Sequence, residues 1–191
     1  GDAGGGKGLE PVGMQVQRFA GQEGGFRHLP VVRLGKLVGM VSERDLRVAR
    51  ALVEEPRVGT IAHEDVVTVQ PGTPVEDAAV LMLRHKIGAL PVLRADRVVG
   101  IVTESDIFRT VIRVMGVLEP SSRLQLELSD LPRQLADIAR VTATLNVPIV
   151  SLVTEPGGEA GHRIVVRRVG TIEPGPLIGA IERCGIRVLE P

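Results

Sequence analysis

The feature that most constrains this 191-residue sequence is an internal repeat. Residues 29–46 align with residues 90–107 at a constant offset of 61 residues, with nine identities in eighteen positions. Identities at one constant offset over that length are not expected by chance, so we expect both segments to adopt the same fold. Each copy predicts a strand, a turn, a second buried strand ending Gly-x-Val-Ser/Thr, and a helix. The identical pairs are Leu29/Leu90, Pro30/Pro91, Val31/Val92, Arg33/Arg94, Val38/Val99, Gly39/Gly100, Val41/Val102, Glu43/Glu104 and Asp45/Asp106.

The second copy is preceded by a well-marked front half. Residues 66–69 predict a short strand that Pro71 and Gly72 end. Thr73 has the position of a helix N-cap, and Glu76 completes a capping box three residues later. The apolar residues that follow have helical spacing, so we expect strand, helix, strand, strand, helix for this unit.

The first copy lacks an equivalent front half. Residues 1–25 contain nine glycines and no helical periodicity. Only Val12, Met14 and Val16 alternate in the manner of a strand. Either this copy is truncated or an irregular segment replaces its opening strand and helix, and the sequence leaves both interpretations open.

A different pattern follows residue 122. Leu124, Leu126 and Leu128 alternate as in a half-buried strand, and residues 131–145 have helical spacing. Segments 149–154 and 163–169 predict a hairpin, and a further helix and a strand at 186–189 complete the order βαββαβ. That order usually builds a four-stranded antiparallel sheet with two helices on one face. We expect Cys184 to be a small core residue, and Arg163, Arg167 and Arg168 to lie on one solvated strand edge.

Composition and charge disfavour several classes of function. The 23 basic residues equal the 23 acidic ones, so neither nucleic acid nor a membrane is an expected partner. Three Phe and no Trp or Tyr leave an aliphatic core and few platforms for base stacking. The single Cys184 excludes an intramolecular disulfide framework and favours a reducing cytoplasm. There is no apolar run of 18 residues and no secretion signal in the first 25.

Catalytic and metal-binding patterns are missing from the sequence. It contains no nucleophile elbow, P-loop, dinucleotide fingerprint or paired metal motif. His63, His85 and His162 have no partner at metal-ligand spacing, so we expect them at the surface. The chain is therefore predicted to be no enzyme and to carry no cofactor and no metal.

The repeated segment Gly-x-Val-Ser/Thr-x-x-Asp suits a sugar site. A hydroxyl at the strand end (Ser42, Thr103) and a carboxylate three residues later (Asp45, Asp106) both project beyond the same sheet edge. A carboxylate can accept two hydrogen bonds from the cis-diol of a ribose, and the amides of a helix N-terminus favour phosphate oxygens. The same residues also form a helix-capping box that needs no ligand, and the two roles can coexist.

These motifs carry a resemblance to known families. The units Leu29-Pro30-Val31 to Asp45 and Leu90-Pro91-Val92 to Asp106 resemble a tandem cystathionine-β-synthase (CBS) domain pair. The tail, with Asp130-Leu131-Pro132 before its helix and Asn146-Val147-Pro148 after it, resembles an ACT domain. Together they resemble the acetoin utilization family of CBS and ACT proteins. The implied fold class is α/β (α+β), a tandem CBS-domain pair followed by a βαββαβ ferredoxin-like ACT domain. The implied boundaries are 1–25 for the atypical Gly-rich segment, 26–60 and 61–118 for the two CBS repeats, and 119–191 for the ACT-like domain.

The resemblance also implies ligand-binding residues. An adenine would lie near Val67 and Thr68, and Arg27 and His28 would contact phosphate where the second copy has Gly88 and Ala89. With Thr103, Asp106, Ser42 and Asp45 these make up the predicted nucleotide site. The corresponding candidates for an ACT ligand are Asp130, Leu131 and Asn146.

The expected function is that of a cytoplasmic, non-catalytic ligand sensor. AMP, ADP, ATP or S-adenosylmethionine would bind between the repeats and shift the population of module arrangements. The tail would bind a second metabolite or mediate assembly, and a homodimer is implied by both families. An oligomerisation or interaction module with a vestigial site is the alternative, and a detached regulatory subunit of an enzyme is a third possibility. The effector protein is unknown.

Overall fold

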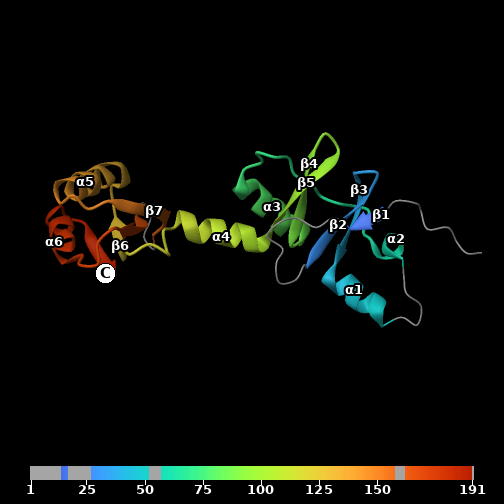
Figure 1. The fold of residues 1–191 in the computed structure, drawn as a ribbon. Coiled ribbons are helices and arrows are strands. Elements are labelled where there is room, and N and C mark those ends of the chain that lie inside the picture. Colours follow the sequence, from blue (N-terminus) through green and yellow to red (C-terminus); the bar gives the residue numbers. More distant parts are fainter. Residues whose placement is uncertain (1–13, 17–26, 52–56, 158–161, 191) are drawn as a thin grey trace, which may run out of the picture. The chain divides into compact units, whose positions relative to one another are not determined.

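The structure is a computed structural model that describes residues 14–16, 27–51, 57–157 and 162–190 (Figure 1). The chain divides into two compact units, Gly1–Ile107 and Phe108–Pro191. Each unit is described by itself below.

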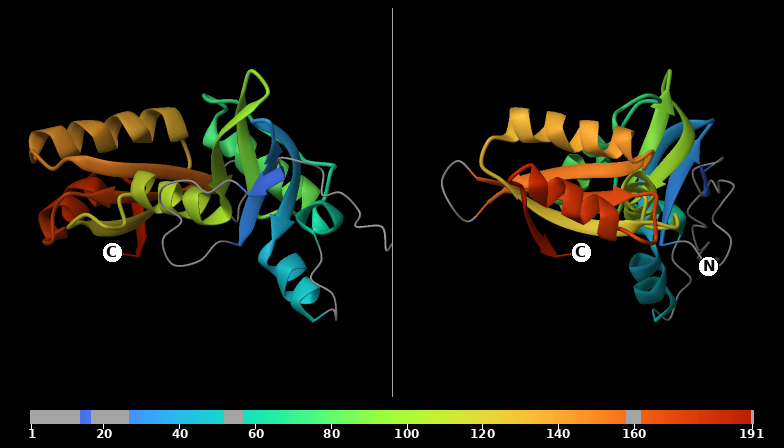
Figure 2. Two further views of the ribbon diagram at one scale, coloured as in Figure 1. Left: turned by 45° about the vertical axis from the view of Figure 1, so that its right-hand side comes forward. Right: turned by 90° about the vertical axis from the view of Figure 1, so that its left-hand side faces the viewer.

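Two repeated hairpins form the centre of the first unit (Figure 2). Strand β2 (His28–Arg33) pairs with β3 (Lys36–Ser42), and β4 (Ala89–Arg94) pairs with β5 (Arg97–Thr103), all antiparallel. Both turns have two central residues with positive φ, Leu34-Gly35 and Ala95-Asp96, which suits the right-handed twist of the flanking strands. The bulges after Val31 and Val92 also differ by 61 positions. The repeat predicted from the sequence is therefore confirmed.

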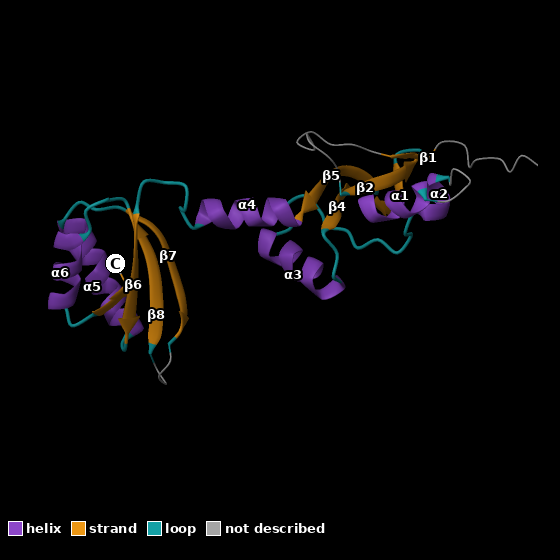
Figure 3. Cartoon of the chain, turned by 90° about the horizontal axis from the view of Figure 1, so that it is seen from below, coloured by secondary structure: helices purple, strands orange, loops and turns teal. Residues whose placement is uncertain are grey.

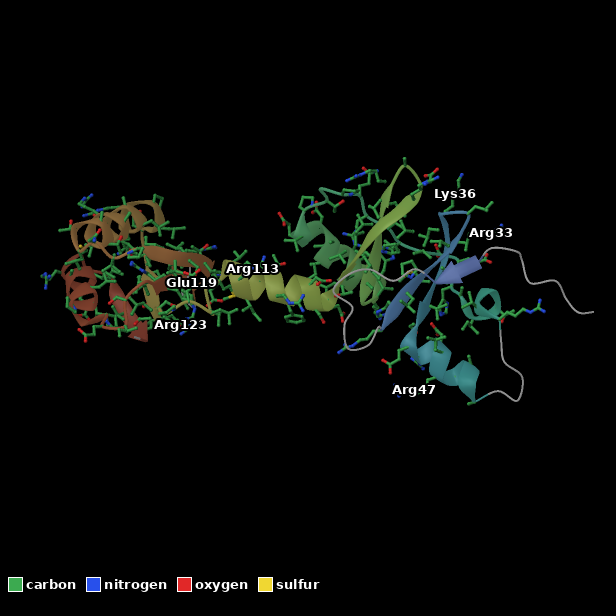
Figure 4. The ribbon with its side chains drawn as sticks, viewed as in Figure 1. Arg33, Lys36, Arg47, Arg113, Glu119 and Arg123 are labelled. Carbon is green, nitrogen blue, oxygen red and sulfur yellow. The ribbon has the colours of Figure 1, made fainter. Side chains whose placement is uncertain are left out.

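The hairpins join into one five-stranded sheet of order β1-β2-β3-β5-β4. They meet where Lys36 is paired with Arg97, at the turn end of each hairpin. Figure 4 labels Arg33 and Lys36 at this end of the first hairpin. Strand β1 (Met14–Val16) pairs with β2, so the expected strand near Met14 and Val16 is confirmed; Val12 lies outside the described residues.

The described helices of this unit are α1 (Glu43–Arg50), α2 (Val58–Ile61) and α3 (Val75–His85). Helix α4 (Glu104–Val114) begins in this unit and continues into the second. Helix α3 packs its apolar face against the second hairpin, where Ala78, Met82, Val69 and Leu90 form a buried cluster. The predicted helices after each repeated strand pair, α1 and α4, are confirmed.

Two predictions about the front half of the second copy are wrong. Residues 66–69 form no strand beyond a single parallel bridge from Val69 to Val92. Thr73 does not cap α3, whose N-cap is Pro74 without a side-chain hydrogen bond. The Thr73 hydroxyl instead accepts a hydrogen bond of 3.1 Å from the backbone N–H of Gln70. Its polar group thus stabilises the turn before the helix.

The second unit has the predicted order βαββαβ. Its elements are β6 (Ser122–Leu128), α5 (Leu131–Thr144), β7 (Ile149–Pro156), β8 (Arg163–Val169), α6 (Gly175–Arg183) and β9 (Arg187–Glu190). The sheet is antiparallel, in the order β7-β8-β6-β9, and both helices lie on one face of it (Figure 3). This is a ferredoxin-like arrangement.

The core of the second unit lies between this sheet and its helices. Leu124, Leu126 and Leu128 are all 0% exposed, as their alternation predicts. Cys184 was expected in this core, which is wrong: it is the exposed C-cap of α6. The solvated edge expected for Arg163, Arg167 and Arg168 is also wrong for Arg167, whose side chain is 0% exposed. It leaves β8 on the same face as the buried Val165 and Val169, because alternate strand residues share a face.

The repeat supplies a matched pair of glycines for a stability test. A Cβ at position 39 would lie 3.0 Å from both the Ala62 Cβ and the His63 carbonyl oxygen, whereas a Cβ at position 100 finds its nearest neighbour, on Val92, at 3.7 Å. His63 cannot retreat easily, because two backbone hydrogen bonds of 2.8 and 2.9 Å join it to Met40. We expect Gly39→Ala to lower the free energy of unfolding by about 1–3 kcal/mol in urea titrations. Gly100→Ala should cause little loss, and equal losses in the two variants would contradict this account.

Candidate functional site

A cavity of about 600 Å³ lies in the first unit. The first copy contributes residues of β2, β3 and α1. The second contributes residues 63–67, the last residue of α3, the loop 86–88 and the start of β4. The lining residues are His28, Met40, Ser42, Asp45, His63, Glu64, Asp65, Val66, Val67, His85, Lys86, Ile87, Gly88 and Ala89. Both repeats therefore supply walls of one space large enough for a small molecule.

Ser42 and Asp45 are positioned by the junction of β3 and α1. Ser42 is the last residue of β3 and the N-cap of α1, and its hydroxyl accepts a hydrogen bond of 3.2 Å from the Asp45 backbone N–H. Asp45 Oδ2 accepts hydrogen bonds from the Ser42 backbone N–H at 2.7 Å and from the Ser42 hydroxyl at 2.6 Å. The capping box is thus formed, and one carboxylate oxygen is fully engaged in it.

The other oxygen of Asp45 is turned to the second copy. Asp45 Oδ1 lies 3.4 Å from His63 Nε2, a contact too long for a strong hydrogen bond. Burial alone would raise the pKa of Asp45, but hydrogen bonds from Ser42 and the neighbouring His63 outweigh it and lower that pKa. The carboxylate is therefore an anion near neutral pH with one oxygen available for a hydroxyl donor.

The second copy repeats this capping geometry. Asp106 Oδ2 accepts hydrogen bonds from the Thr103 backbone N–H at 2.9 Å and from its hydroxyl at 2.7 Å. Neither residue lines the 600 Å³ cavity. Residues 85–89 line the cavity next to Asp45. At the 61-residue offset, the equivalent residues next to Asp106 would be 24–28, of which 24–26 lie outside the described residues.

The remaining nucleotide-site candidates fall at different places. His28 and Val67 line the cavity with Ser42 and Asp45, whereas Thr68 lines a separate space of about 400 Å³ beside the hairpin turns. Arg27 lines neither cavity, and its carbonyl accepts a hydrogen bond from the Glu43 N–H. The eight candidates are thus not gathered at one site.

Three basic residues of the cavity were missed by sequence reasoning. His63, His85 and Lys86 belong to its lining, although both histidines are exposed as expected. His85 and Lys86 stand a few residues before the Leu90-Pro91 pair, which is a signal that the sequence does contain. His63 has no such signal, since only its backbone pairing with Met40 brings it beside Asp45.

His28 and Gly88 show why the two copies are not interchangeable. A Cβ at position 88 would lie 2.9 Å from His28 Cε1 and 3.4 Å from Glu104 Oε2, so a glycine here leaves room for the imidazole. Burial lowers the pKa of His28, and the nearby Arg27 lowers it further, while the carboxylates of Glu104 and Asp45 act in the opposite direction. The imidazole is therefore neutral at pH 7.

The lowered pKa of His28 predicts a loss of stability in acid. Between the folded-state pKa and 6.5 the unfolded chain binds more protons at this position, so the free energy of unfolding falls as the pH falls through that range. Urea titrations at pH 7.5 and 5.5 would measure this loss. His28→Gln should reduce the difference between the two pH values. His85→Gln, which removes an exposed imidazole of the same cavity, should leave it unchanged; the reverse order would contradict the assignment.

The candidates for a ligand of the tail lie at opposite ends of one helix. Asp130 is the N-cap of α5 and Leu131 is its first residue, whereas Asn146 follows the last turn with φ 52°. A helix of 14 residues is about 21 Å long. Within one copy of the domain these residues therefore do not form one site, because the full length of α5 separates Asp130 and Leu131 from Asn146.

The described part of the chain shows neither a candidate metal centre nor a membrane-spanning helix. No group of three or more His, Cys, Asp or Glu side chains there has the geometry to hold a metal ion. None of the helices described is both long and apolar enough to cross a membrane.

Two repeats that share a cavity, each with a capped strand-to-helix junction, define a tandem α/β module. The family model for the CBS domain matches residues 10–51 and 58–113. The chain is also 35% identical over 112 residues to a CBS domain-containing protein of Dictyostelium discoideum, a match that covers 51% of this chain and 77% of the relative. The chain therefore belongs to the CBS-domain family, with two CBS domains in tandem.

Solved structures resemble part of the chain. A protein of Vibrio cholerae assigned to acetoin utilization (AcuB) is 37% identical over 49% of this chain and 72% of its own, with a TM-score of 0.44. The CBS domain pair of protein MJ0100, solved with 5′-methylthioadenosine and S-adenosyl-L-methionine, is 37% identical over 44% of this chain and 69% of its own, with a TM-score of 0.42. Other curated relatives are much longer enzymes, of which this chain spans 17% in one case and 37% in another.

Proposed function

We propose that this protein is a non-catalytic regulatory sensor that binds an adenosine-containing nucleotide in the cavity between its CBS repeats. The observation that carries the proposal is the placement of Asp45, an ionised carboxylate that lines a cavity of about 600 Å³, with Oδ2 committed to the helix cap and Oδ1 beside His63 of the same lining. A carboxylate oxygen accepts hydrogen bonds from sugar hydroxyls.

The rest of the cavity suits the other parts of such a ligand. Val66, Val67 and Ile87 supply apolar surface for a flat base, and Lys86 supplies a positive charge for a phosphate. Ligand binding would shift the protein toward the arrangement that binds the ligand better. AMP, ADP, ATP and S-adenosylmethionine are the candidate ligands.

The second unit is proposed to be an ACT-like domain that binds a further metabolite or mediates assembly. Its support is the antiparallel βαββαβ sheet with two helices on one face, together with Asp130 at the start of α5. Participation in acetoin utilization and a place in the cytoplasm belong to the same proposal.

The two capping aspartates provide a matched test of the nucleotide site. Asp45→Ala and Asp106→Ala each remove one capping box, so both should lose about 1 kcal/mol of stability. At a hundredfold excess over Kd, a nucleotide that binds only the folded protein adds about 2.7 kcal/mol. Thermal shift and titration calorimetry with the four candidate ligands should show that addition for the wild type and Asp106→Ala, and not for Asp45→Ala. Flat titrations of folded wild-type protein with all four ligands would overturn the proposed function.

A second candidate, an assembly module, is favoured by the exposed surface of α4. Phe108, Val111 and Ile112 are 69%, 45% and 39% exposed, and their spacing places them on one face of the helix. Exposed apolar stripes of this kind mark protein contacts. We expect a homodimer formed through this stripe.

Light scattering after size-exclusion chromatography tests the homodimer. Phe108→Ser should shift the protein to monomer by removing the largest apolar side chain of the stripe. Leu34→Asn, which changes an even more exposed apolar residue in the β2–β3 turn, should leave the mass unchanged. A wild-type protein that stays monomeric at all concentrations would exclude this dimer.

A further inference from the structure

Arg167 is a buried cation in an apolar layer. It lies on β8 opposite Leu124 of β6 and Leu152 of β7, and residues in register across antiparallel strands share a face. On this face Leu124, Val165 and Val169 are all 0% exposed, and they pack with Ile138 of α5 and with Leu177 and Ile181 of α6. The guanidinium therefore lies between the sheet and its helices.

The nitrogens of Arg167 have no hydrogen-bond partner among the residues that the structure describes. Nε, Nη1 and Nη2 are all buried and unsatisfied. Neighbouring arginines differ: Arg163 donates to Thr154 at 3.2 Å, Arg168 to Ser121 at 3.4 Å, and Arg187 lies 3.1 Å from Glu127. Among these, Arg167 alone is fully enclosed and lacks an oxygen partner in the described part of the chain.

Deprotonation does not relieve this charge. Burial lowers the pKa of Arg167 to about 10, so the side chain is still a cation at pH 7. An uncompensated buried charge destabilises a fold strongly, whereas the same charge paired with an anion does not. The site thus lacks a negative group, and it presents five N–H donors in a planar fork.

The sheet edge next to Arg167 is partly open. Strand β7 is the edge strand beside β8, and Leu152, which shares the face of Arg167, is 38% exposed although it is apolar. The helices therefore do not cover this part of β7. A ligand that displaced the Leu152 side chain would meet the guanidinium one strand further in.

The surroundings determine the kind of anion. A carboxylate matches the guanidinium fork through two parallel hydrogen bonds and carries the single negative charge needed for neutrality. A doubly charged phosphate would leave an excess charge in an apolar layer. The leucine and valine side chains around the fork suit a short aliphatic body.

We propose that Arg167 is the anchor of a second ligand site, in the βαββαβ unit, that takes a small aliphatic monocarboxylate entering past Leu152. The site rests on the proposed role of the second unit as a metabolite-binding domain, and it is separate from the nucleotide cavity of the CBS repeats.

Thermal unfolding of the full chain with potassium isovalerate tests the proposal. In potassium chloride, Arg167→Met should raise the Tm of the second unit by about 5 °C or more, because an apolar side chain of similar length replaces an unpaired charge. Isovalerate should raise the Tm of the wild type and not that of Arg167→Met. Isovaleramide, its neutral isostere, should have no effect on either. Arg168→Met, on the same strand but the opposite face, should respond to isovalerate as the wild type does.

An NMR measurement on the wild type tests the proposal even if a variant fails to fold. In the wild type, isovalerate should shift the ¹⁵N resonance of Arg167 Nε, assigned by its loss in the conservative Arg167→Lys variant. Two outcomes would overturn the proposal. One is a wild type whose Tm and Arg167 resonance ignore isovalerate while Arg167→Met is destabilised, since the charge is then paired within the chain. The other is a response to inorganic phosphate and none to isovalerate.

Discussion

The hydrogen bonds between Ser42 and Asp45 fix the geometry on which the cavity depends. One carboxylate oxygen binds both the N–H and the hydroxyl of the residue that ends β3, so the direction in which α1 leaves the sheet is set by a single side chain. That same constraint determines where the second oxygen points, which is toward His63 and the second copy. The sequence left open whether this motif caps a helix, binds a ligand or does both. In the folded chain the cap uses one oxygen of the carboxylate, so the other oxygen is left for the proposed ligand contact.

The duplication gives the two halves of the module the same fold, and different residues at equivalent positions make the halves chemically different. The capping boxes, hairpin turns and bulges recur at the same offset, because these features build the strands and their turns. Residues at equivalent positions next to or in the cavity differ: His28 stands where the second copy has Ala89, and Arg27, which does not line the cavity, stands where it has Gly88. Because Gly88 has no side chain, the His28 imidazole can occupy the space beside it. The two halves have thus become complementary at this cavity, with a ring from one copy filling space opened in the other.

Features governed by local periodicity could be predicted from the sequence, and features governed by distant packing could not. The repeated strands, the βαββαβ order and the buried Leu124, Leu126 and Leu128 follow from alternation and turn residues. His63 lies beside Asp45 because its backbone pairs with that of Met40, and no sequence pattern near His63 indicates this pairing. Cys184 has helical spacing in the sequence, but it is the C-cap of α6, one residue past the last helical residue, and it is exposed. The prediction that Thr73 caps the helix was wrong because a hydroxyl just before a helix can instead hydrogen-bond within the preceding turn.

Arg167 shows a different reason why the sequence pattern alone did not predict a residue's position. Its position in the core follows from its neighbours, because Val165 and Val169 must face the helices and a one-residue slip would turn the whole apolar set to the other side of the sheet. The register is therefore fixed whatever residue stands at position 167, and an aliphatic side chain would meet the same requirement without a buried charge. Asp45 is a polar residue that the fold uses for its own stability and presents to the cavity at the same time. Arg167 is a polar residue that the fold tolerates at a cost, and a charge of that kind is best explained by something that binds it.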